Sequence, residues 1–449
     1  MAELRKSRYC FLINKGDDYL AYTSATNSFY KINEYVAGLI KSVSIDERAV
    51  KTEPNGEELE TLHKLRLLTT REEDDVVVDL LRMKYLTHSY AQDYVSVTLA
   101  PTTSCNLRCP YCFEKNKQSA VMSNETCDKV IDFVKSHPCA KNLSLVWYGG
   151  EPMLCVNVIK YILSKIDELG DIKLRSHNMV TNGTLLSGSN LEIFREHTLD
   201  SIQVTLDGNK STHDTKRIYA NGVGSYDKII ENLNAFIKSY PETFVAIRVN
   251  IDKNNANEFM DVYETIKGLF PGKKNINVYP GILKCCGKQS TDSPFMMNKD
   301  VVRINAEFRK RGYPPMFLNT FDCGCCATGL TSYVIGPKGE IYKCWEDVGE
   351  ESLIVGNINE KTYTNMPLLA KYMLHGSRIF EDECRECPLF PVCSNDCAKN
   401  RLGNKFMDKG YDLCSIYKSK DYVELGEMLY DFYQGYVKYK ECNECKQCD

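Results

Sequence analysis

The middle of the chain, from about residue 93 to residue 283, alternates short apolar segments with longer amphipathic ones. The short segments are predicted as strands, at Tyr94–Ala100, Leu143–Tyr148, His177–Thr181, Ser201–Leu206, Phe244–Ile251 and Ile276–Gly281. In the longer segments apolar residues recur every three or four positions, which predicts helices over Asn124–Ser136, Val156–Leu169, Asn190–His197, Tyr226–Tyr240 and Ala256–Leu269. Because parallel strands need such crossovers, the predicted fold class is α/β. Six units fit a partial (β/α)6 barrel better than a closed barrel of eight strands.

Residues 1–90 follow a different pattern, which predicts a small unit separate from the barrel at 91–283. Its predicted strands and helices are Tyr9–Asn14, Tyr19–Thr23, Ser28–Ile32, Glu34–Val43 and Glu57–Leu68. Three strands with two or three helices have the outline of a winged helix. Residues 1–75 carry 11 Lys and Arg against 14 Asp and Glu, a net charge of −3 (11 − 14) that argues against binding a DNA duplex. A peptide-binding or structural role is therefore expected.

The apolar periodicity fades after residue 283, and the chain becomes rich in cysteine. Residues 284–322 are predicted as a linker, and residues 323–449 as a loop-rich domain whose core is supplied largely by metal. Three regular elements are predicted there, at Tyr333–Ile335, Glu340–Lys343 and Asp421–Lys440. Twelve of the 21 cysteines lie between Cys323 and the C-terminus, so this region is the main candidate for metal clusters.

Charge and composition limit the classes of function. The net charge of −4 argues against a surface built to bind nucleic acid. No apolar run reaches the roughly 18 residues needed to cross a bilayer, so no membrane partner is expected. The first residues lack the apolar core of a signal peptide, which predicts a cytoplasmic protein. Because the cytosol disfavours disulfides, clustered cysteines there indicate metal binding or redox chemistry.

Cys105, Cys109 and Cys112 follow the first predicted barrel strand with the spacing C-x3-C-x2-C. Three thiolates in one compact loop can bind three irons of a four-iron cluster and leave the fourth iron without a protein ligand. An open metal position is typical of a catalytic site. A zinc knuckle is the alternative, but no His or fourth Cys lies close in sequence to complete a tetrahedron.

This motif resembles the signature of the radical SAM superfamily, in which an aromatic residue, here Tyr111, precedes the third cysteine. The resemblance implies a [4Fe-4S] cluster on these three catalytic cysteines, with S-adenosylmethionine (SAM) as the second cofactor. It also implies SAM-binding residues at the ends of the later strands, namely Gly149, Gly150, Glu151, Asn182, Thr205, Arg217 and Asn250. In the superfamily the backbone of the Gly-Gly-Glu segment meets the amino group of SAM. Thr205 and Arg217 resemble the hydroxyl and guanidinium residues near the SAM carboxylate.

The C-terminal cysteines resemble the SPASM domain of radical SAM peptide-modifying enzymes, which carries two auxiliary four-iron clusters and would bring the total to three. The resemblance implies an outer cluster held by Cys384, Cys387, Cys393 and Cys414. It implies an inner cluster held by Cys344 and Cys397 with one or two of Cys323, Cys325 and Cys326, of which Cys325 is favoured. If only one of those three binds, the inner cluster keeps an open iron for a substrate thiolate. A zinc ribbon is the alternative for this region.

The N-terminal unit, placed before such a core, resembles the leader-recognition element of ribosomal-peptide maturases. The resemblance implies that a leader peptide adds a strand beside Phe29, Tyr30, Lys31 and Ile32, next to the helix Glu57–Leu68. A structural cap on the barrel is the alternative.

Over nearly its whole length the chain is most similar to the maturases of Cys-rich SCIFF peptides, of the sactipeptide and ranthipeptide type. This implies thioether formation between a cysteine and a backbone or side-chain carbon of a precursor peptide with a leader. A small electron donor such as ferredoxin or flavodoxin is the second expected partner. The alternatives are an anaerobic sulfatase-maturing enzyme, which forms formylglycine, and a non-catalytic multi-cluster electron carrier.

Overall fold

The computed structural model describes residues 4–43, 56–112, 118–283, 294–296, 298–314, 318, 325–360, 362–394, 396–415, 418 and 423–445. Cys323, one of the predicted ligands, and part of the predicted linker lie outside these residues. In the described part of the chain no helix is long and apolar enough to cross a membrane.

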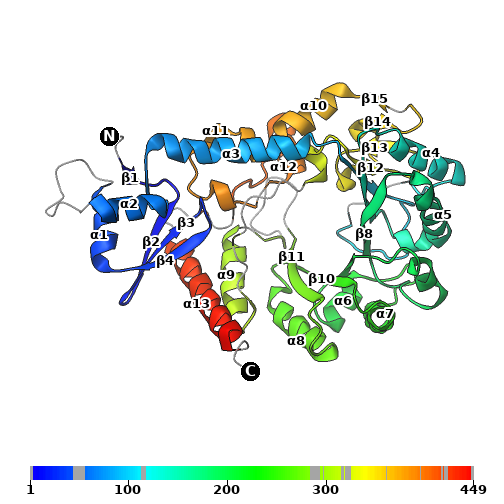
Figure 1. The fold of residues 1–449 in the computed structure, drawn as a ribbon. Helices are drawn as coiled ribbons and strands as arrows, with labels where there is room; N and C mark the ends of the chain where they lie inside the picture. The colour runs from blue at the N-terminus through cyan, green and yellow to red at the C-terminus, as the bar shows by residue number, and fades with distance from the viewer. Residues whose placement is uncertain are drawn as a thin grey trace.

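A parallel sheet forms the centre of the molecule (Figure 1). Its six successive strands are β6 (Tyr94–Leu99), β7 (Asn142–Trp147), β8 (Lys173–Thr181), β9 (Ser201–Leu206), β10 (Phe244–Ile251) and β11 (Ile276–Ile282). Each pairs in parallel with the next one in sequence. Within the described residues β11 pairs only with β10, so the sheet is open at this edge, as in an incomplete barrel. The six predicted strands and the α/β class are confirmed.

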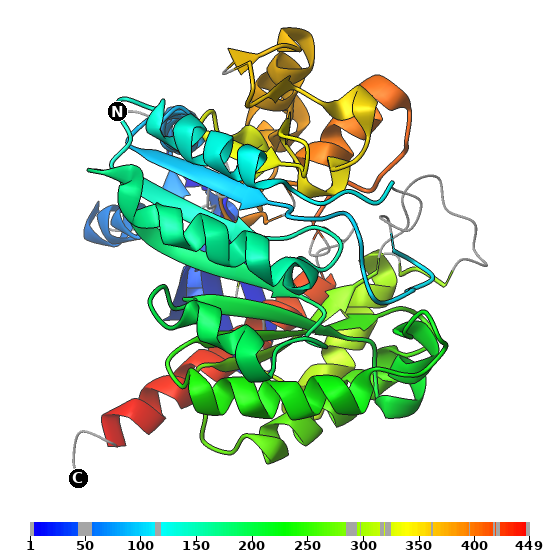
Figure 2. The ribbon, with the colours of Figure 1, turned by 90° about the vertical axis from the view of Figure 1, so that its right-hand side faces the viewer.

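Helices connect these strands and lie on the outer side of the sheet (Figure 2). They are α4 (Asn124–Lys135), α5 (Val156–Ile166), α6 (Lys210–Lys216), α7 (Tyr226–Ser239) and α8 (Phe259–Leu269). The predicted α-helix at 190–197 is wrong, because residues Gly188–Phe194 form a 3-10 helix instead. This segment begins at Gly188, whose φ of +58° lies outside the range of a regular α-helix.

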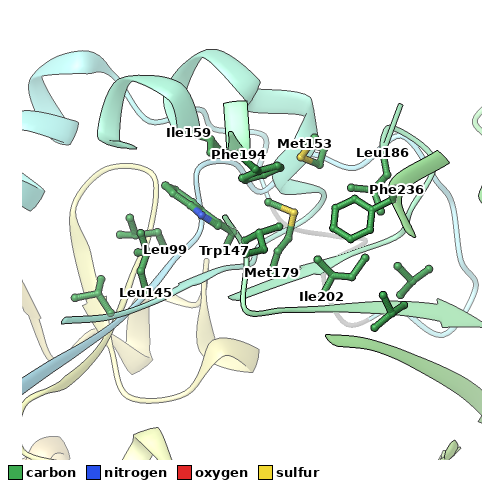
Figure 3. Packing of buried hydrophobic residues seen from close by; sticks show 14 of the residues in the cluster. Leu99, Leu145, Trp147, Met153, Ile159, Met179, Leu186, Phe194, Ile202 and Phe236 are labelled. Carbon is green, nitrogen blue, oxygen red and sulfur yellow. The ribbon is translucent and has the colours of Figure 1, made fainter. Parts of the chain in front are cut away.

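The core of the barrel fills the space between the sheet and these helices (Figure 3). Trp147 at the end of β7 is fully buried, and its indole N–H donates to Nε2 of the buried His177 at 2.7 Å. Phe194 and Phe236 close the same core from the helical side. Burial of each such side chain stabilises the fold by roughly 2 kcal/mol. The same core also contains Tyr333, Ile335 and Ile341 of the C-terminal region.

The N-terminal unit is a three-stranded antiparallel sheet with helices on one face. Its sheet contains β2 (Cys10–Lys15), β3 (Asp18–Thr23) and β4 (Ser28–Ile32), and β1 (Arg5–Lys6) pairs with β5 (Leu68–Thr69). The helices are α1 (Glu34–Ser42), α2 (Gly56–Lys64) and α3 (Arg71–Ser89). The three predicted strands and both predicted helices are present, but α3 was not predicted. The role of this unit stays a prediction.

The other face of this sheet is covered by the last helix, α13 (Val423–Cys445), which was predicted at Asp421–Lys440. Leu425, Leu429 and Phe432 of α13 pack with Leu20 and Tyr22 of the sheet. The N-terminal unit and the last helix are therefore joined by one apolar core (Figure 1).

The C-terminal region continues the barrel sheet rather than forming a sheet apart. The two elements predicted at Tyr333–Ile335 and Glu340–Lys343 are strands. Of these, β12 (Ser332–Ile335) pairs in parallel with β6 and antiparallel with β13 (Glu340–Tyr342). Two short strands, β14 (Gly356–Asn357) and β15 (Thr362–Tyr363), extend the edge. The helices here are α9 (Asn298–Lys310), α10 (Met366–His375), α11 (Asp382–Arg385) and α12 (Ala398–Met407).

Candidate active site

The loop that carries Cys105, Cys109 and Cys112 is held against the ends of neighbouring strands. The N–H of Gly150, after β7, donates to the carbonyl of Thr102 at 3.0 Å, and the N–H of Glu151 donates to that of Ser104 at 2.9 Å. On the other side, the N–H of Arg108 donates to the carbonyl of Ile218 at 2.8 Å. The cysteine loop is therefore fixed by backbone hydrogen bonds from two later segments.

Gly149 and Gly150 are glycines because the two loops touch. A Cβ on Gly149 would lie 2.4 Å from the carbonyl oxygen of Thr102, and its φ is +108°. A Cβ on Gly150 would lie 2.2 Å from the carbonyl oxygen of Ser104. Only glycine permits this approach of one backbone to another.

Glu151 is fully buried, and its carboxylate joins two strand ends. It accepts from the N–H of Met153 at 3.0 Å, from the hydroxyl of Thr181 at 2.7 Å and from the N–H of Asn182 at 2.7 Å. Burial raises the pKa of this carboxyl, while the three donors oppose the shift. Because three protein donors already occupy the carboxylate, this side chain holds the site together and leaves ligand contact to the backbone.

Asn182 brings the third barrel strand to the cysteine loop. Its side-chain amide donates to Asn106 at 2.8 Å and lies 3.7 Å from the sulfur of Cys105. The N–H of Leu107 also points at that sulfur, at 3.4 Å. Burial raises the pKa of the Cys105 thiol to about 11, and these two donors work against the shift. They stabilise a thiolate at this position.

A second set of predicted residues meets around Tyr111. Its hydroxyl donates to the fully buried Asp207, and it accepts from Nη1 of Arg217 at 3.1 Å and from the amide of Asn250 at 3.3 Å. Arg217 and Asp207 also form an ion pair at 3.9 Å. Burial raises the pKa of the Asp207 carboxyl, and Arg217 opposes that shift. Tyr111, Arg217 and Asn250, which come from three segments, therefore lie in one network.

Two buried polar atoms in this network lack a hydrogen-bond partner among the described residues. Among the described residues, Nε of Arg217 and Oδ1 of Asp207 make no hydrogen bond. A buried guanidinium N–H without a partner is costly, and a bound carboxylate would satisfy it. Asp207 was not singled out from the sequence, although it stands two residues after the predicted Thr205. Thr205 itself is half-buried on β9 and makes no side-chain hydrogen bond to the described chain.

The predicted outer cysteines lie close together. Cys384 interacts electrostatically with Cys387 and Cys393, and Cys387 also interacts with Cys393 and Cys414. Arg378 and Arg401 face Cys384, and each works against the burial that raises the pKa of its thiol. Positive charge therefore surrounds this group on the protein side.

The inner cysteines also meet. Cys325 and Cys326 share a side-chain hydrogen bond, Cys326 faces Cys344, and Cys397 faces Cys325. The described residues thus bring four thiols to this place, one more than the three that the sequence favours. In the same described residues, no three His, Cys, Asp or Glu side chains converge on one point as a single metal ion requires. The thiolates of a four-iron cluster stand further apart, because each binds a different iron.

An aromatic contact links the two cysteine regions. The ring of Tyr148, directly before Gly149, stacks on the indole of Trp345, directly after Cys344, with centroids 5.2 Å apart and planes 12° from parallel. Trp345 is 40% exposed, whereas the only other tryptophan, Trp147, is fully buried. Neither residue was predicted as part of a site, because nothing in the local pattern relates the two positions.

The predicted leader-binding residues occupy the outer strand of the N-terminal sheet. Among the described strands, β4 pairs only with β3, so its other edge is unpaired. Phe29 faces α13, with its ring 6.0 Å from that of Tyr433, while Tyr30 and Ile32 pack with α1 and α2 on the opposite face. Lys31 forms an ion pair with Asp18 at 3.0 Å. This edge has the form that strand addition requires.

Comparison with known proteins finds a family model that matches most of the central domain. Residues 99–266 match the model of the radical SAM superfamily. A cysteine-type anaerobic sulfatase-maturating enzyme of Clostridium novyi (strain NT) is 24% identical over 344 residues, covering 69% of this chain and 89% of that protein.

Two solved structures share the fold. The structure of anSMEcpe with bound AdoMet and the Kp18Cys peptide has a TM-score of 0.58 and 19% identity, over 79% of this chain and 99% of the other. Streptococcus suis SuiB bound to the precursor peptide SuiA has a TM-score of 0.51 and 15% identity, over 92% of this chain and 100% of the other.

Proposed function

Because residues 99–266 form a radical SAM superfamily domain, we propose that this chain is a radical SAM enzyme that modifies a peptide. One observation carries the proposal. The cysteine loop, the Gly149–Gly150 turn and the Arg217–Asp207–Tyr111 network meet at the carboxyl ends of the barrel strands. Catalytic sites of barrel folds are built at this end, from the loops that follow the strands.

The residues present fit an iron–sulfur cluster and SAM. Cys105, Cys109 and Cys112 would hold three irons, and the unpartnered Nε of Arg217 suits the carboxylate of SAM. When bound, the cluster and SAM supply a carbon radical that removes hydrogen from a substrate carbon.

The side chains around this site orient and enclose the cofactors. The Leu107 N–H and the Asn182 amide direct the Cys105 thiolate, and Asp207 keeps Tyr111 and Arg217 in place. Glu151 ties the ends of β7 and β8 together behind the loop. Asp207, Glu151 and Arg217 are all at least nine-tenths buried, so water is kept away from this side of the site.

We further propose that the substrate is a Cys-rich precursor peptide and that the product is a thioether between a cysteine and a backbone or side-chain carbon. The unpaired edge of β4 supports capture of a leader as an added strand. The SuiB structure contains the bound precursor peptide SuiA, which supports a peptide substrate for a chain of this fold.

The proposal includes two auxiliary clusters. The outer one would be held by Cys384, Cys387, Cys393 and Cys414, and the inner one by Cys325, Cys344 and Cys397. Cys326 lies beside Cys325 and faces Cys344, so an open iron at the inner cluster requires that Cys326 remain a free thiol. Such a cluster would supply a site for the electron left over when the carbon–sulfur bond forms.

A second function is favoured by the Clostridium novyi relative, which is a cysteine-type sulfatase-maturating enzyme. In the formylglycine reaction the cysteine loses its sulfur. The two products differ in composition, since a thioether keeps the sulfur and loses only hydrogen.

Mass spectrometry of a peptide substrate distinguishes the two. The reconstituted chain is incubated anaerobically with SAM, reductant and Cys-rich precursors encoded beside its gene. We expect a loss of two hydrogens per modified cysteine, with that thiol no longer open to alkylation. Loss of sulfur would favour formylglycine, and SAM turnover with unmodified thiols would contradict both.

A further inference from the structure

The inner face of the barrel sheet lies opposite the connecting helices (Figure 2) and carries a positive charge on β10. Val245, Ile247 and Val249 of this strand pack in the apolar core on the helical side. Because successive side chains of a strand point to opposite faces, Arg248 and Asn250 point to the inner face. Arg248 is half-buried, so its charge lies within the fold rather than in open water.

The Arg248 side chain is held in one place. Its Nε donates to Oδ1 of Asn250 at 2.9 Å. Gly281 pairs with Asn250 on the neighbouring strand β11, and a Cβ at Gly281 would lie 2.4 Å from Nε of Arg248. Only glycine at this position leaves room for the guanidinium. Since the amide of Asn250 also donates to Tyr111, Arg248 is joined to the proposed SAM site.

The neighbours of Arg248 on the inner face are polar and uncharged. Arg248 pairs with Thr205 on β9 and with Tyr279 on β11. The hydroxyl of Tyr279 donates to Oε1 of Gln203 at 2.7 Å, and it reaches across β10 where the small Ala246 pairs with Gln203. Burial raises the pKa of Tyr279, and the positive charge of Arg248 opposes the shift, so the guanidinium lies near this hydroxyl.

Arg248 has no counter-ion within the chain that the structure describes. The carboxylates at the ends of the same strands are engaged elsewhere, since Asp252 pairs with Lys216 at 2.9 Å and Asp207 pairs with Arg217. A half-buried guanidinium gives up part of its hydration, and a bound carboxylate restores the lost interactions. The inner face therefore offers a place for one negative charge from outside the chain.

We infer that Arg248 binds a carboxylate of the peptide substrate and thereby selects which residue lies at the SAM site. The inference rests on the proposed function, since it requires a peptide substrate. Two groups of a peptide have this chemistry, an Asp or Glu side chain and the C-terminal carboxylate. A guanidinium suits either of them, because its N–H groups form a fork that matches the two oxygens.

The position of Arg248 makes the contact selective. Arg248 stands two residues before Asn250 on the same face, which is about 7 Å along the strand. A carboxylate bound there places the adjoining residues of the peptide next to the Tyr111 network. Removal of hydrogen requires that the target carbon be held close to the SAM site, so this charge contact helps to determine which carbon reacts.

The test compares three synthetic peptides that contain one Cys and are acetylated at the N-terminus. The first has Asp beside the Cys and an amidated C-terminus, and the second has Asn and the same amide. The third has Asn and a free C-terminal carboxylate. Their binding to the reconstituted full chain with SAM is measured by isothermal titration calorimetry. We expect one of the two carboxylated peptides to bind roughly tenfold more tightly than the neutral one, which also identifies the source of the carboxylate.

Variants connect this preference to Arg248. In R248Q the three peptides should bind equally, while SAM binds as in the wild type. R248K should keep part of the preference, because Lys retains the charge without the fork. The matched control is R175Q, which removes the same charge from an exposed arginine of β8 that bonds to Asn142, and the preference should stay.

Four results would count against the inference. Equal affinity of the wild type for all three peptides would overturn it, and so would a preference that persists in R248Q. Weaker binding of SAM to R248Q would assign Arg248 to the cofactor instead. Failure of all three peptides to bind, with SAM binding intact, would overturn the proposed peptide substrate and the inference with it. Binding of the neutral peptide thus separates the two failures.

Discussion

The barrel and the cysteine-rich region both gather thiols, but they support them differently. In the barrel the loop of Cys105, Cys109 and Cys112 rests on an extensive apolar core and is fixed by backbone hydrogen bonds from neighbouring strand ends. The outer cysteines are joined by short segments, the longest being the ten residues of α12. The packed barrel holds the first group of cysteines in place, whereas metal bound by the outer cysteines must itself help to stabilise the region around them.

The packing of the outer cysteines shows the same contrast. Cys384 and Cys387 pack against Tyr9 and Tyr85, and Cys387 also touches the cluster of Leu20, Tyr22 and α13. The outer group therefore lies where the N-terminal unit meets the C-terminal region. A cluster bound there would connect three parts of the chain, and a cluster in the barrel loop would connect none.

The largest expected difference comes from removing one proposed ligand in each region. Cys109→Ser should lower SAM cleavage at least a thousandfold, because a cluster without its third thiolate is not held for chemistry. The unfolding transition of the barrel should not move, since its core is untouched. Cys387→Ser should lower the free energy of unfolding by several kcal/mol and expose the N-terminal unit to protease, because Cys387 also packs against that unit. Calorimetry measures the unfolding transition of each variant, and limited proteolysis measures the exposure of the N-terminal unit. Equal loss of stability in the two variants would remove the distinction.

Sequence pattern predicted the barrel strands and the last helix, but it missed helix α3 of the N-terminal unit. The six strands could be predicted because each is a short segment between helical periods in which apolar, buried residues recur at every second position or more often, as in β9. Helix α3 was missed because its buried face is interrupted by polar residues. It buries Asp74 and Ser89 along with Val78 and Tyr85, and only the capping box of Thr70 and Glu73 marks its start.

Long-range contacts explain the remaining omissions. The pairing of β12 with β6 joins Ser332 to Ser96, and no local signal relates residues so far apart. Asp207 is a site residue because Tyr111 and Arg217 fold onto it, which its position after a strand does not reveal. The cysteine motifs, by contrast, can be recognised in the sequence, because each spacing lies within a few residues, and the binding of clusters by these cysteines stays a prediction.

A smaller effect is expected when the support behind the barrel site is altered. Glu151→Gln keeps the shape but turns one oxygen into an NH2 group, and in either orientation of the amide this donor faces a backbone N–H, that of Met153 or that of Asn182. We expect a loss of about 3 kcal/mol in the free energy of unfolding, with weaker SAM binding. Denaturant titration and isothermal calorimetry measure these. Glu168→Gln, an exposed residue of the same charge paired to Lys165, is the matched control. A stable E151Q variant would show that the strand ends do not depend on this carboxylate.

The stability of the barrel should depend on pH because of one buried histidine in its core. Burial lowers the pKa of His177 from 6.5 to about 4. The folded barrel therefore holds His177 neutral, with Nε2 accepting from Trp147, while the unfolded chain takes up a proton below about pH 6.5. The stabilisation is complete above pH 6.5 and is lost as pH falls toward 4, by roughly 3 kcal/mol in all.

The free energy of unfolding of the iron-free chain, measured at about pH 7 and about pH 5, tests this slope of stability against pH. His177→Gln should flatten it, since the proton-binding group is gone. His88→Gln, a change at an exposed position on α3, should leave the slope as it is. A wild-type stability that does not change between the two values of pH would contradict the assignment of a neutral His177.

The smallest expected effect concerns the contact between the two regions. Tyr148→Ala removes the ring that stacks on Trp345, which should lower the free energy of unfolding by about 1 kcal/mol. Tyr148→Phe keeps the ring and should change this free energy little. Trp345 is its own reporter, because Trp147 is fully buried and out of reach of a quencher. In the iron-free chain, acrylamide should therefore quench Trp345 more strongly in Y148A than in wild type or Y148F. If the stack sets the spacing between the SAM site and the inner cysteines, Y148A should also release more cleaved SAM per modified peptide. If neither the quenching of Trp345 nor the amount of SAM cleaved per modified peptide changes in Y148A, the barrel and the cysteine-rich region act without this contact.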